Sequence, residues 1–329
     1  MKTRTYSPTP ANLRRLAHAL QQGALVAIPT ETVYGLAAHA LDTHACQAIF
    51  KAKGRPTQDP LIVHVLDLAH AEMLATFNEA ARNVVRHFWP GPLTLVLQKK
   101  PCVPAIVTAG RDTVAIRSPA HPLTRRLLQL AGVPLAAPSA NLFGYVSPTS
   151  AAHVRDGLEG KIPHILDGGT CRVGVESTIL DLTNPKRPKI LRPGSVTAAD
   201  LEKVLGVKIV GSVRRQSPDK GKSGLIAPGM LAQHYSPHTS LTIKDAWTKL
   251  PPNVAGIFLR KPPRTKAAPN IYWLSKRASL TEVARNLYRV LRQADQGSHQ
   301  QIWIESLPDN SGGLAAAIND RMRRAAAKR

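Results

Sequence analysis

The chain has 329 residues, which is room for two domains, because one hydrophobic core rarely grows beyond about 250–300 residues. Its hydrophobic content of 43%, with 5% aromatics, fits a globular protein with aliphatic cores and excludes the collagenous and disulfide-rich classes. The net charge is +23, and the longest aliphatic runs fall far short of the roughly 18 residues of a membrane span, so we expect no membrane segment.

The first half of the chain alternates between helix and strand patterns. Pro8-Thr9-Pro10 precedes apolar residues at helical spacing from Leu13 to Leu20, and Gly23 ends this short amphipathic helix. A buried strand is predicted at Ala24–Ile28, and the loop PTETVYGL (29–36) follows it, where open α/β sheets bind ligands. The same patterns predict further helices at Ala45–Lys51 and Leu123–Leu130, and strands at Pro60–Val65, Leu93–Leu97, Thr113–Arg117 and Leu135–Ala137. This alternation predicts a twisted α/β sheet of mixed strand direction.

A linker is predicted at 211–240, because this segment is rich in Gly, Ser and Pro and has little periodicity. It divides the chain into a domain at 1–210 and a second domain at 241–329. In the second domain we expect strands at Val254–Leu259, Ile271–Leu274 and Gln301–Ile304, and helices at Thr281–Gln293 and Leu314–Ala326. These elements predict a smaller, Rossmann-like α/β domain, and the absence of GxGxxG argues against a dinucleotide there.

Charge and cysteine usage narrow the function classes. Both predicted domains hold more Lys and Arg than Asp and Glu, a diffuse positive field that would attract ATP and hold RNA loosely. Without an RNA-recognition, KH or zinc-finger motif, we expect tRNA binding to be weak at most. Cys46, Cys102 and Cys171 are odd in number and widely spaced, which favours buried thiols over disulfides or zinc. The first 16 residues contain no apolar leader segment, and together with the cysteine usage this predicts a cytoplasmic protein.

Three positions are suited to binding anions. Lys53 and Arg55 share a proline-bounded turn and could hold nucleotide phosphates in place of a Walker A loop, although a solvated basic turn is the alternative. Arg117 ends an apolar strand and suits a substrate carboxylate, with a structural salt bridge as the alternative.

His64 lies within a predicted strand, where a histidine is most often a core or surface residue. PSAN (138–141) follows the strand Leu135–Ala137 and offers hydroxyl, amide and backbone groups, although a plain turn would explain this segment taken singly. No metal-ligand spacing is present, so we expect no protein metal site, and Mg²⁺ held mainly by phosphates and water.

A resemblance to one family covers nearly the whole chain. PTETVYGL (29–36), KGRP (53–56), PLIVHV (60–65), AIRSP (115–119), PSAN (138–141), ESTILDL (176–182) and ILRPGSV (190–196) resemble, in order, the signatures of YrdC-type threonylcarbamoyl-AMP synthases. PGMLAQHYSPHTSL (228–241) and GGLAAAINDRMRRAA (312–326) resemble the linker and C-terminal domain of the longer, two-domain members.

The resemblance implies a reaction and a set of contacts. Family members condense L-threonine, bicarbonate and ATP into threonylcarbamoyl-AMP and pyrophosphate, and a separate transferase complex passes the threonylcarbamoyl group to tRNA beside the anticodon. Threonine contacts are implied for Thr32, His64, Arg117, Ala137 and Ser177. ATP contacts are implied for Arg55, Asp59, Thr113, Ser139, Asn141, Ser147 and Arg192, with Lys53 and Arg55 as the catalytic cations. Asp59 stands where many members have asparagine, which puts its role in doubt.

The resemblance also implies that the linker folds back across the mouth of the first domain, with Tyr235 reaching the bicarbonate or carbamate end of the substrate; a plain tether is the alternative. Two other functions stay open. A hydrogenase-maturation carbamoyltransferase shares this kind of domain, but it would need zinc-finger and acylphosphatase segments. A non-catalytic RNA-binding factor is suggested by the charge alone.

Overall fold

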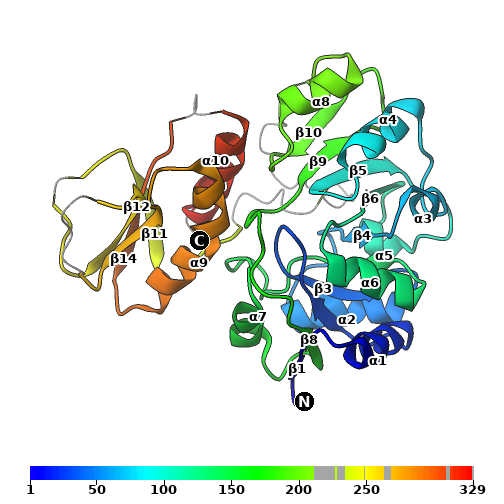
Figure 1. Cartoon of the computed structure of the whole chain (residues 1–329), viewed down its shortest axis with the longest axis horizontal. Helices are drawn as coiled ribbons and strands as arrows, with labels where there is room; N and C mark the ends of the chain where they lie inside the picture. The colour runs from blue at the N-terminus through cyan, green and yellow to red at the C-terminus, as the bar shows by residue number, and fades with distance from the viewer. Residues whose placement is uncertain (211–226, 228–233, 248, 263–267, 309–311, 328–329) are drawn as a thin grey trace.

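Two sheets, each with its own helices, make up the computed structural model (Figure 1). The structure describes residues 1–210, 227, 234–247, 249–262, 268–308 and 312–327. Most of the predicted linker, including Pro228-Gly229-Met230, therefore lies outside the described residues. No helix in the described part is long and apolar enough to cross a membrane.

The larger sheet lies wholly within residues 1–210 and has ten strands in the order β1-β8-β2-β3-β7-β4-β6-β5-β9-β10. Parallel and antiparallel pairs alternate irregularly, so the predicted mixed sheet is confirmed. Its strands are β1 (Arg4–Tyr6), β2 (Val26–Ile28), β3 (Gly35–His39), β4 (Ile62–His64), β5 (Leu93–Gln98), β6 (Thr113–Arg117), β7 (Leu135–Ala136), β8 (His164–Leu166), β9 (Thr178–Asp181) and β10 (Lys189–Arg192).

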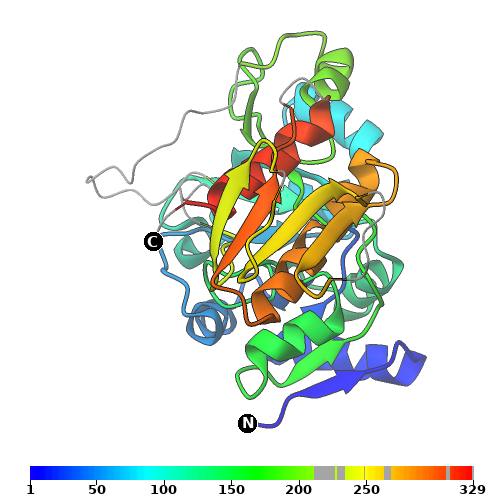
Figure 2. The same cartoon turned by 90° about the vertical axis from the view of Figure 1, so that its left-hand side faces the viewer.

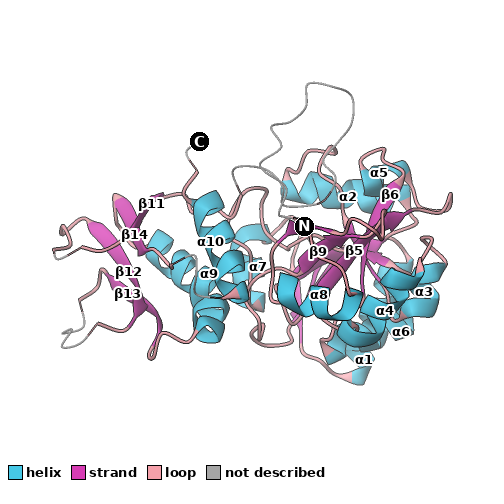
Figure 3. Ribbon diagram, turned by 90° about the horizontal axis from the view of Figure 1, so that it is seen from above, coloured by secondary structure: helices cyan, strands magenta, loops and turns pink. Residues whose placement is uncertain are grey.

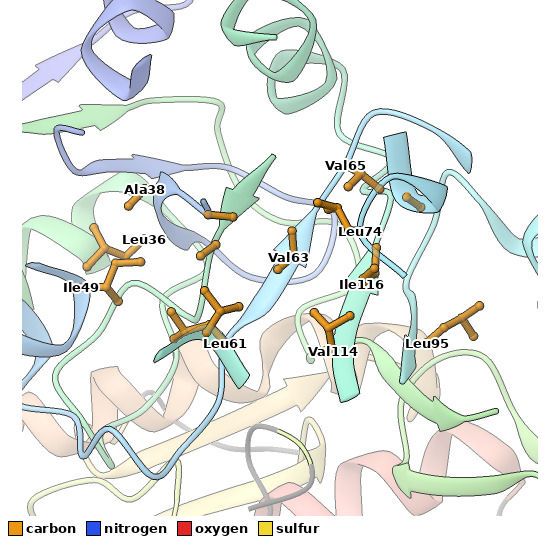
Figure 4. Packing of buried hydrophobic residues seen from close by; sticks show 14 of the residues in the cluster. Leu36, Ala38, Ile49, Leu61, Val63, Val65, Leu74, Leu95, Val114 and Ile116 are labelled. Atoms are coloured by element: carbon orange, nitrogen blue, oxygen red, sulfur yellow. The ribbon is translucent and has the colours of Figure 1, made fainter. Parts of the chain in front are cut away.

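Helices cover both faces of this sheet. They are α1 (Pro10–Gln21), α2 (Thr43–Lys53), α3 (Leu68–Glu72), α4 (Glu79–Phe88), α5 (Ala105–Thr108), α6 (Pro122–Ala131), α7 (Ala151–Leu158) and α8 (Ala198–Leu205). Alternate strand residues face α1 and α6 on one side, and α2, α4, α7 and α8 on the other. Figure 4 shows the second of these layers, where Ile49 of α2 lies against Leu36 and Leu61 near the centre of the sheet.

The smaller sheet is parallel throughout, in the order β11-β14-β12-β13. Its strands are β11 (Ser240–Lys244), β12 (Val254–Arg260), β13 (Ile271–Ser275) and β14 (Gln301–Glu305), and its helices are α9 (Leu280–Gln296) and α10 (Gly313–Ala325). Both helices lie on the side of the sheet that faces the larger domain, as the front view and the view from above agree (Figures 1 and 3). Turned by 90°, the molecule presents the four strands in front of these helices (Figure 2).

Several strands differ from the sequence-based expectation. The predicted loop at 29–36 already contains the start of β3, and the ESTILDL and ILRPGSV segments form the antiparallel pair β9 and β10. β11 starts at Ser240, inside the predicted linker. The division at 210/211 and 240/241 stays a prediction, because most of the linker lies outside the described residues.

Candidate active site

The main candidate site is a cavity at the ends of β4 and β6, with about 510 Å³ of empty space that includes open solvent. The sequence-predicted residues that line it are Thr32, Arg55, His64, Arg117, Ala137, Ser139, Ser177, Arg192 and Tyr235. Five others do not line it, namely Lys53, Asp59, Thr113, Asn141 and Ser147.

Strand pairing places His64 and Arg117 beside one another. β4 and β6 are parallel neighbours, and their register sets His64 opposite Arg117. Since parallel strands end at the same edge of a sheet, both side chains reach the same face of the cavity. Thr113 begins β6, about 13 Å from Arg117 along the strand, which explains why it lies outside this cavity.

Arg117 is buried and held by three neighbours. Its Nη1 donates to Thr32 Oγ1 at 2.9 Å, its Nε donates to the Gly91 carbonyl at 3.1 Å, and its Nη2 lies 2.7 Å from Glu31 Oε1. Burial, the largest single effect, would raise the pKa of Glu31, but the charge of Arg117 together with hydrogen bonds from Arg117 and from backbone N–H groups lowers it. The salt bridge weighed as the alternative role of Arg117 is thus present, while the guanidinium still lines the cavity.

His64 remains neutral in this setting. Burial, with the nearby charge of Arg117, lowers its pKa to about 3. Its Nδ1 lies 3.3 Å from the Ile62 carbonyl, a long contact that leaves the ring oriented mainly by packing. An uncharged imidazole beside Arg117 can exchange hydrogen bonds with a polar substrate without adding positive charge.

Arg55 enters the site because α2 stops at Gly54, which adopts the left-handed conformation with φ 62°. Its Nη2 lies 3.0 Å from Asp59 Oδ1 and donates to the Pro60 carbonyl at 2.7 Å. Both members of the pair are almost completely buried, which rules out a solvated basic turn. Burial raises the pKa of Asp59 even though Arg55 opposes the shift.

Lys53 lies behind the cavity wall. Its ammonium group donates to the carbonyls of Ser139 and Asn141, and burial lowers its pKa well below the usual value. Asn141 in turn donates to the carbonyls of Leu142 and Tyr145. Together these contacts fix the segment that presents Ser139 to the cavity.

Ser177 and Arg192 line the cavity and are bonded to one another. Arg192 donates from Nη2 to Ser177 Oγ at 3.1 Å and to the Ser177 carbonyl at 3.0 Å, and Ser177 Oγ also lies 2.7 Å from Thr94 Oγ1. Burial lowers the pKa of Arg192, because the guanidinium is removed from water.

The described end of the linker contributes to the cavity wall. His234 and Tyr235 line it and are themselves buried, and Ala227 packs against Ile62 and Ala115 on the same sheet face. Tyr235 has φ +63°, a left-handed conformation that costs a bulky residue of order 1–3 kcal/mol and is concentrated at functional sites. Among the described residues its hydroxyl has no hydrogen-bond partner.

Sequence reasoning did not assign three polar residues that line the cavity, namely Thr30, Glu176 and His234. It also missed three polar residues that bond to cavity residues without lining the cavity, namely Glu31, Tyr288 and Arg321. Glu31 and Glu176 are acids inside quoted motifs, yet an isolated acid in a sequence is most often exposed. Tyr288 of α9 and Arg321 of α10 come from the smaller domain, far along the chain, and both bond to Glu176. The GGLAAAINDRMRRAA motif contains Arg321, which was the one available signal.

Known proteins match this chain over nearly its full length. A family model described as "Telomere recombination" matches residues 18–194, and one described as "Threonylcarbamoyl-AMP synthase, C-terminal domain" matches residues 196–327. The threonylcarbamoyl-AMP synthase of Pyrococcus abyssi is 40% identical, covering 96% of this chain and 94% of its own length. That of Bacillus subtilis is 39% identical, with coverages of 98% and 95%. A crystal structure of P. abyssi Sua5 complexed with L-threonine superposes with a TM-score of 0.86, at 38% identity and 98% coverage of both chains.

Proposed function

The chain belongs to the family of the threonylcarbamoyl-AMP synthases, and we propose that the cavity at the ends of β4 and β6 is where its substrates react. The enzyme is a nucleotidyltransferase that condenses L-threonine, bicarbonate and ATP into threonylcarbamoyl-AMP and pyrophosphate, for the threonylcarbamoyladenosine modification of tRNA. The observation that carries the site assignment is the presence of three buried guanidinium groups, Arg55, Arg117 and Arg192, around one cavity. An amino acid carboxylate and a triphosphate both need such groups.

We assign threonine to the Arg117 side of the cavity. Arg117 is held by Thr32 and Glu31 with its guanidinium at the cavity wall, where it can bind the substrate carboxylate. His64, beside it and neutral, is suited to the amino or hydroxyl group. The Ala137 backbone and the Ser177 hydroxyl complete the proposed threonine contacts.

ATP is assigned to the side formed by Arg55, Ser139 and Arg192. Lys53 and Asn141 act here by fixing the segment that carries Ser139. Thr113 and Ser147 lie outside the cavity, and we keep them as proposed contacts for the more distant parts of the nucleotide. Asp59 lies against Arg55, so we infer that its carboxylate competes with phosphate for the same guanidinium.

The reaction needs no nucleophile from the protein; it needs the three substrates to be held in position. The amine of threonine attacks the carbon of bicarbonate, a C–O bond breaks, and water leaves as the carbamate forms. A carbamate oxygen then attacks the α-phosphorus and pyrophosphate leaves. Holding the reactants in line, and neutralising phosphate charge with Arg55 and Arg192, supplies the catalysis. Mg²⁺ would enter with the phosphates of ATP, whose oxygens are ligands that this ion prefers; the described residues contain no cluster of three His, Cys, Asp or Glu side chains suited to a metal.

His234 and Tyr235 are proposed as the lid of this site, with Tyr235 near the bicarbonate or carbamate end. Their burial and the strained backbone of Tyr235 support this role. A cover of this kind keeps water from the carbamate and the acyl-adenylate, both of which hydrolyse.

The remaining partners are also proposals. We expect the product to pass to a tRNA threonylcarbamoyl transferase complex, and tRNA to bind this chain only weakly through its diffuse positive charge. A cytoplasmic location is consistent with free thiols at all three cysteines, two of them buried. Cys102 is exposed, against the expectation of three buried thiols.

A pyrophosphate-release assay tests the proposal directly. Release should depend on threonine, bicarbonate and ATP when each is omitted in turn. Valine, nearly isosteric with threonine, should react poorly, because a buried site that pairs a substrate hydroxyl penalises an analogue without one. Equal rates with valine and threonine would reject the assignment of hydroxyl-binding groups at this cavity.

A further inference from the structure

Glu176 lies at the contact between the two domains and is bonded from both sides. Its Oε1 accepts a hydrogen bond from Ser147 Oγ at 2.7 Å, within the larger domain. Its Oε2 accepts one from the Tyr288 hydroxyl at 2.8 Å and one from Arg321 Nε at 2.7 Å, both in the smaller domain. Glu176 also lines the cavity and precedes Ser177 in the chain.

The three partners of this carboxylate are all inaccessible to water. Ser147 and Tyr288 are fully buried and Arg321 is 1% exposed. Burial alone would raise the pKa of Glu176, but the charges of Arg321 and Arg192 outweigh it and lower the pKa to about 2. Removing one partner of a buried ion pair leaves the other charge uncompensated, so the position of this carboxylate depends on Arg321.

Arg321 and Tyr288 also contact the described end of the linker. The Arg321 guanidinium lies over the Tyr235 ring at 5.4 Å, and the Tyr235 and Tyr288 rings stack at 5.7 Å. The backbone N–H of His234 donates to the Arg324 carbonyl at the end of α10. Two cavity residues, Glu176 and Tyr235, therefore share the same two supports in the smaller domain.

We propose that Arg321 and Tyr288 are positioning residues of the active site, which hold Glu176 and through it Ser147 and Ser177. The smaller domain thereby completes the catalytic site without touching the substrates. This inference rests on the proposed function, in which Ser147 and Ser177 contact ATP and threonine. The competing explanation is that Arg321 and Tyr288 only hold the domains together.

The test compares Arg321→Gln and Tyr288→Phe with Arg285→Gln in the full chain. Arg285 is a matched control, because it also bridges the domains, donating from Nε to the Arg172 carbonyl at 2.9 Å, but it is exposed and does not contact Glu176. Each variant is checked for folding by circular dichroism and for an unfolding midpoint well above the assay temperature. Initial rates of pyrophosphate release are then measured with ATP and threonine varied separately.

We expect Arg321→Gln and Tyr288→Phe each to lower kcat/KM for ATP by about tenfold, the effect of one hydrogen bond to a charged group. The threonine KM, set mainly by Arg117 and Thr32, should change less than about threefold. Because both variants act on one carboxylate, the double variant should lose less than the product of the single losses. Arg285→Gln should stay within about twofold of the wild type.

Two results would overturn the inference: folded Arg321→Gln and Tyr288→Phe variants with wild-type kinetics, or an equal loss in Arg285→Gln. If Arg321→Gln does not fold, the kinetics of Tyr288→Phe alone test the inference, because this variant removes only the hydroxyl that bonds to Glu176 and keeps the packed ring. The activity of the wild type distinguishes a failure of this inference from a failure of the proposed function. A wild type without threonine-dependent pyrophosphate release rejects the proposed function, whereas an active wild type with unaffected variants rejects only the role of Arg321 and Tyr288.

Discussion

Arg117 donates a hydrogen bond to the side-chain oxygen of Thr32 across 2.9 Å. The contact fixes one edge of the guanidinium while the group lines the cavity. Thr32→Val keeps the shape of the side chain and removes this acceptor, so we expect threonine to bind about tenfold more weakly. Isothermal titration calorimetry measures the change, and Thr32→Ser, which retains the hydroxyl, serves as the control. Wild-type affinity in Thr32→Val would show that the contact does not orient Arg117 for the substrate.

Arg55→Ala should weaken ATP binding by about tenfold or more, through loss of a charge-assisted contact to phosphate. The same change leaves the buried carboxylate of Asp59 uncompensated and should lower the free energy of unfolding by about 3–5 kcal/mol. The double variant Arg55→Ala/Asp59→Asn removes the stranded charge and should recover part of the stability but none of the ATP affinity. Urea denaturation and ATP titration separate the two effects. Unaltered ATP binding in the stable double variant would remove Arg55 from the nucleotide site.

The hydroxyl of Tyr235 is buried without a hydrogen-bond partner among the described residues, which makes it available to a ligand. We expect Tyr235→Phe to lower the rate of threonylcarbamoyl-AMP formation by about tenfold, and Tyr235→Ala by more, because the ring that covers the cavity is also lost. Product formation is followed by chromatography of the adenylate. If Tyr235→Phe is as active as the wild type, the cover acts through its ring alone.

Stability should fall on acidification because of His234. Burial, with the charge of Arg55 next in importance, lowers its pKa to about 3, against about 6.5 in an unfolded chain. Between these values the unfolded chain binds a proton that the folded protein does not. The free energy of unfolding therefore decreases as the pH falls below 6.5, by about 2 kcal/mol at pH 5 for this residue.

The measurement is urea denaturation at pH 7.5 and pH 5.0 for the wild type and His234→Asn. His64 contributes in the same direction in both proteins, so the difference between them isolates His234. An identical pH dependence in the two proteins would contradict the buried, neutral state of His234.

Any association with tRNA should be weak and should decrease steeply with salt, because it would come from phosphate neutralisation by a diffuse net charge of +23. Filter binding or fluorescence anisotropy measures the dissociation constant for tRNA at salt concentrations from about 50 to about 200 mM, the range over which binding of this kind weakens strongly. Tight binding that discriminates among tRNAs at physiological salt would instead support specific RNA recognition by this chain.

Sequence patterns predicted helices and strands best where an apolar run or a helical periodicity begins and ends at clear polar or turn residues. The strand Thr113–Arg117 agrees with β6 at both ends, and the long helix at Thr281–Gln293 lies within α9. β3 was missed because Gly35 and the polar TET triplet before it resemble a loop, although its backbone pairs with β2 and β7. Strand pairing of this kind depends on distant partners, which local patterns do not contain.

In the candidate site, too, local motifs could be predicted and contacts between distant segments could not. His64 and Arg117 were each identified by motif, but their adjacency follows from the pairing of β4 with β6, which spacing along the chain does not reveal. Glu31 and Glu176 were missed because burial of an acid depends on the arginine that compensates it, and those arginines lie 86 and 145 residues further along. The assigned roles of the substrate contacts still come from the family resemblance and stay predictions.

The distance along the chain between Glu176 and Arg321 also affects how the protein is made. A ribosome synthesises Arg321 145 residues after Glu176, so the larger domain emerges long before the group that compensates its buried carboxylate. Domains generally fold as units in the order of their synthesis. The nascent larger domain therefore has to keep Glu176 hydrated or protonated until α10 arrives. A chain released before that point would carry most of the substrate-binding residues without the two side chains that hold Glu176. Under the proposed positioning role, incomplete translation products are expected to be inactive rather than to consume ATP wastefully.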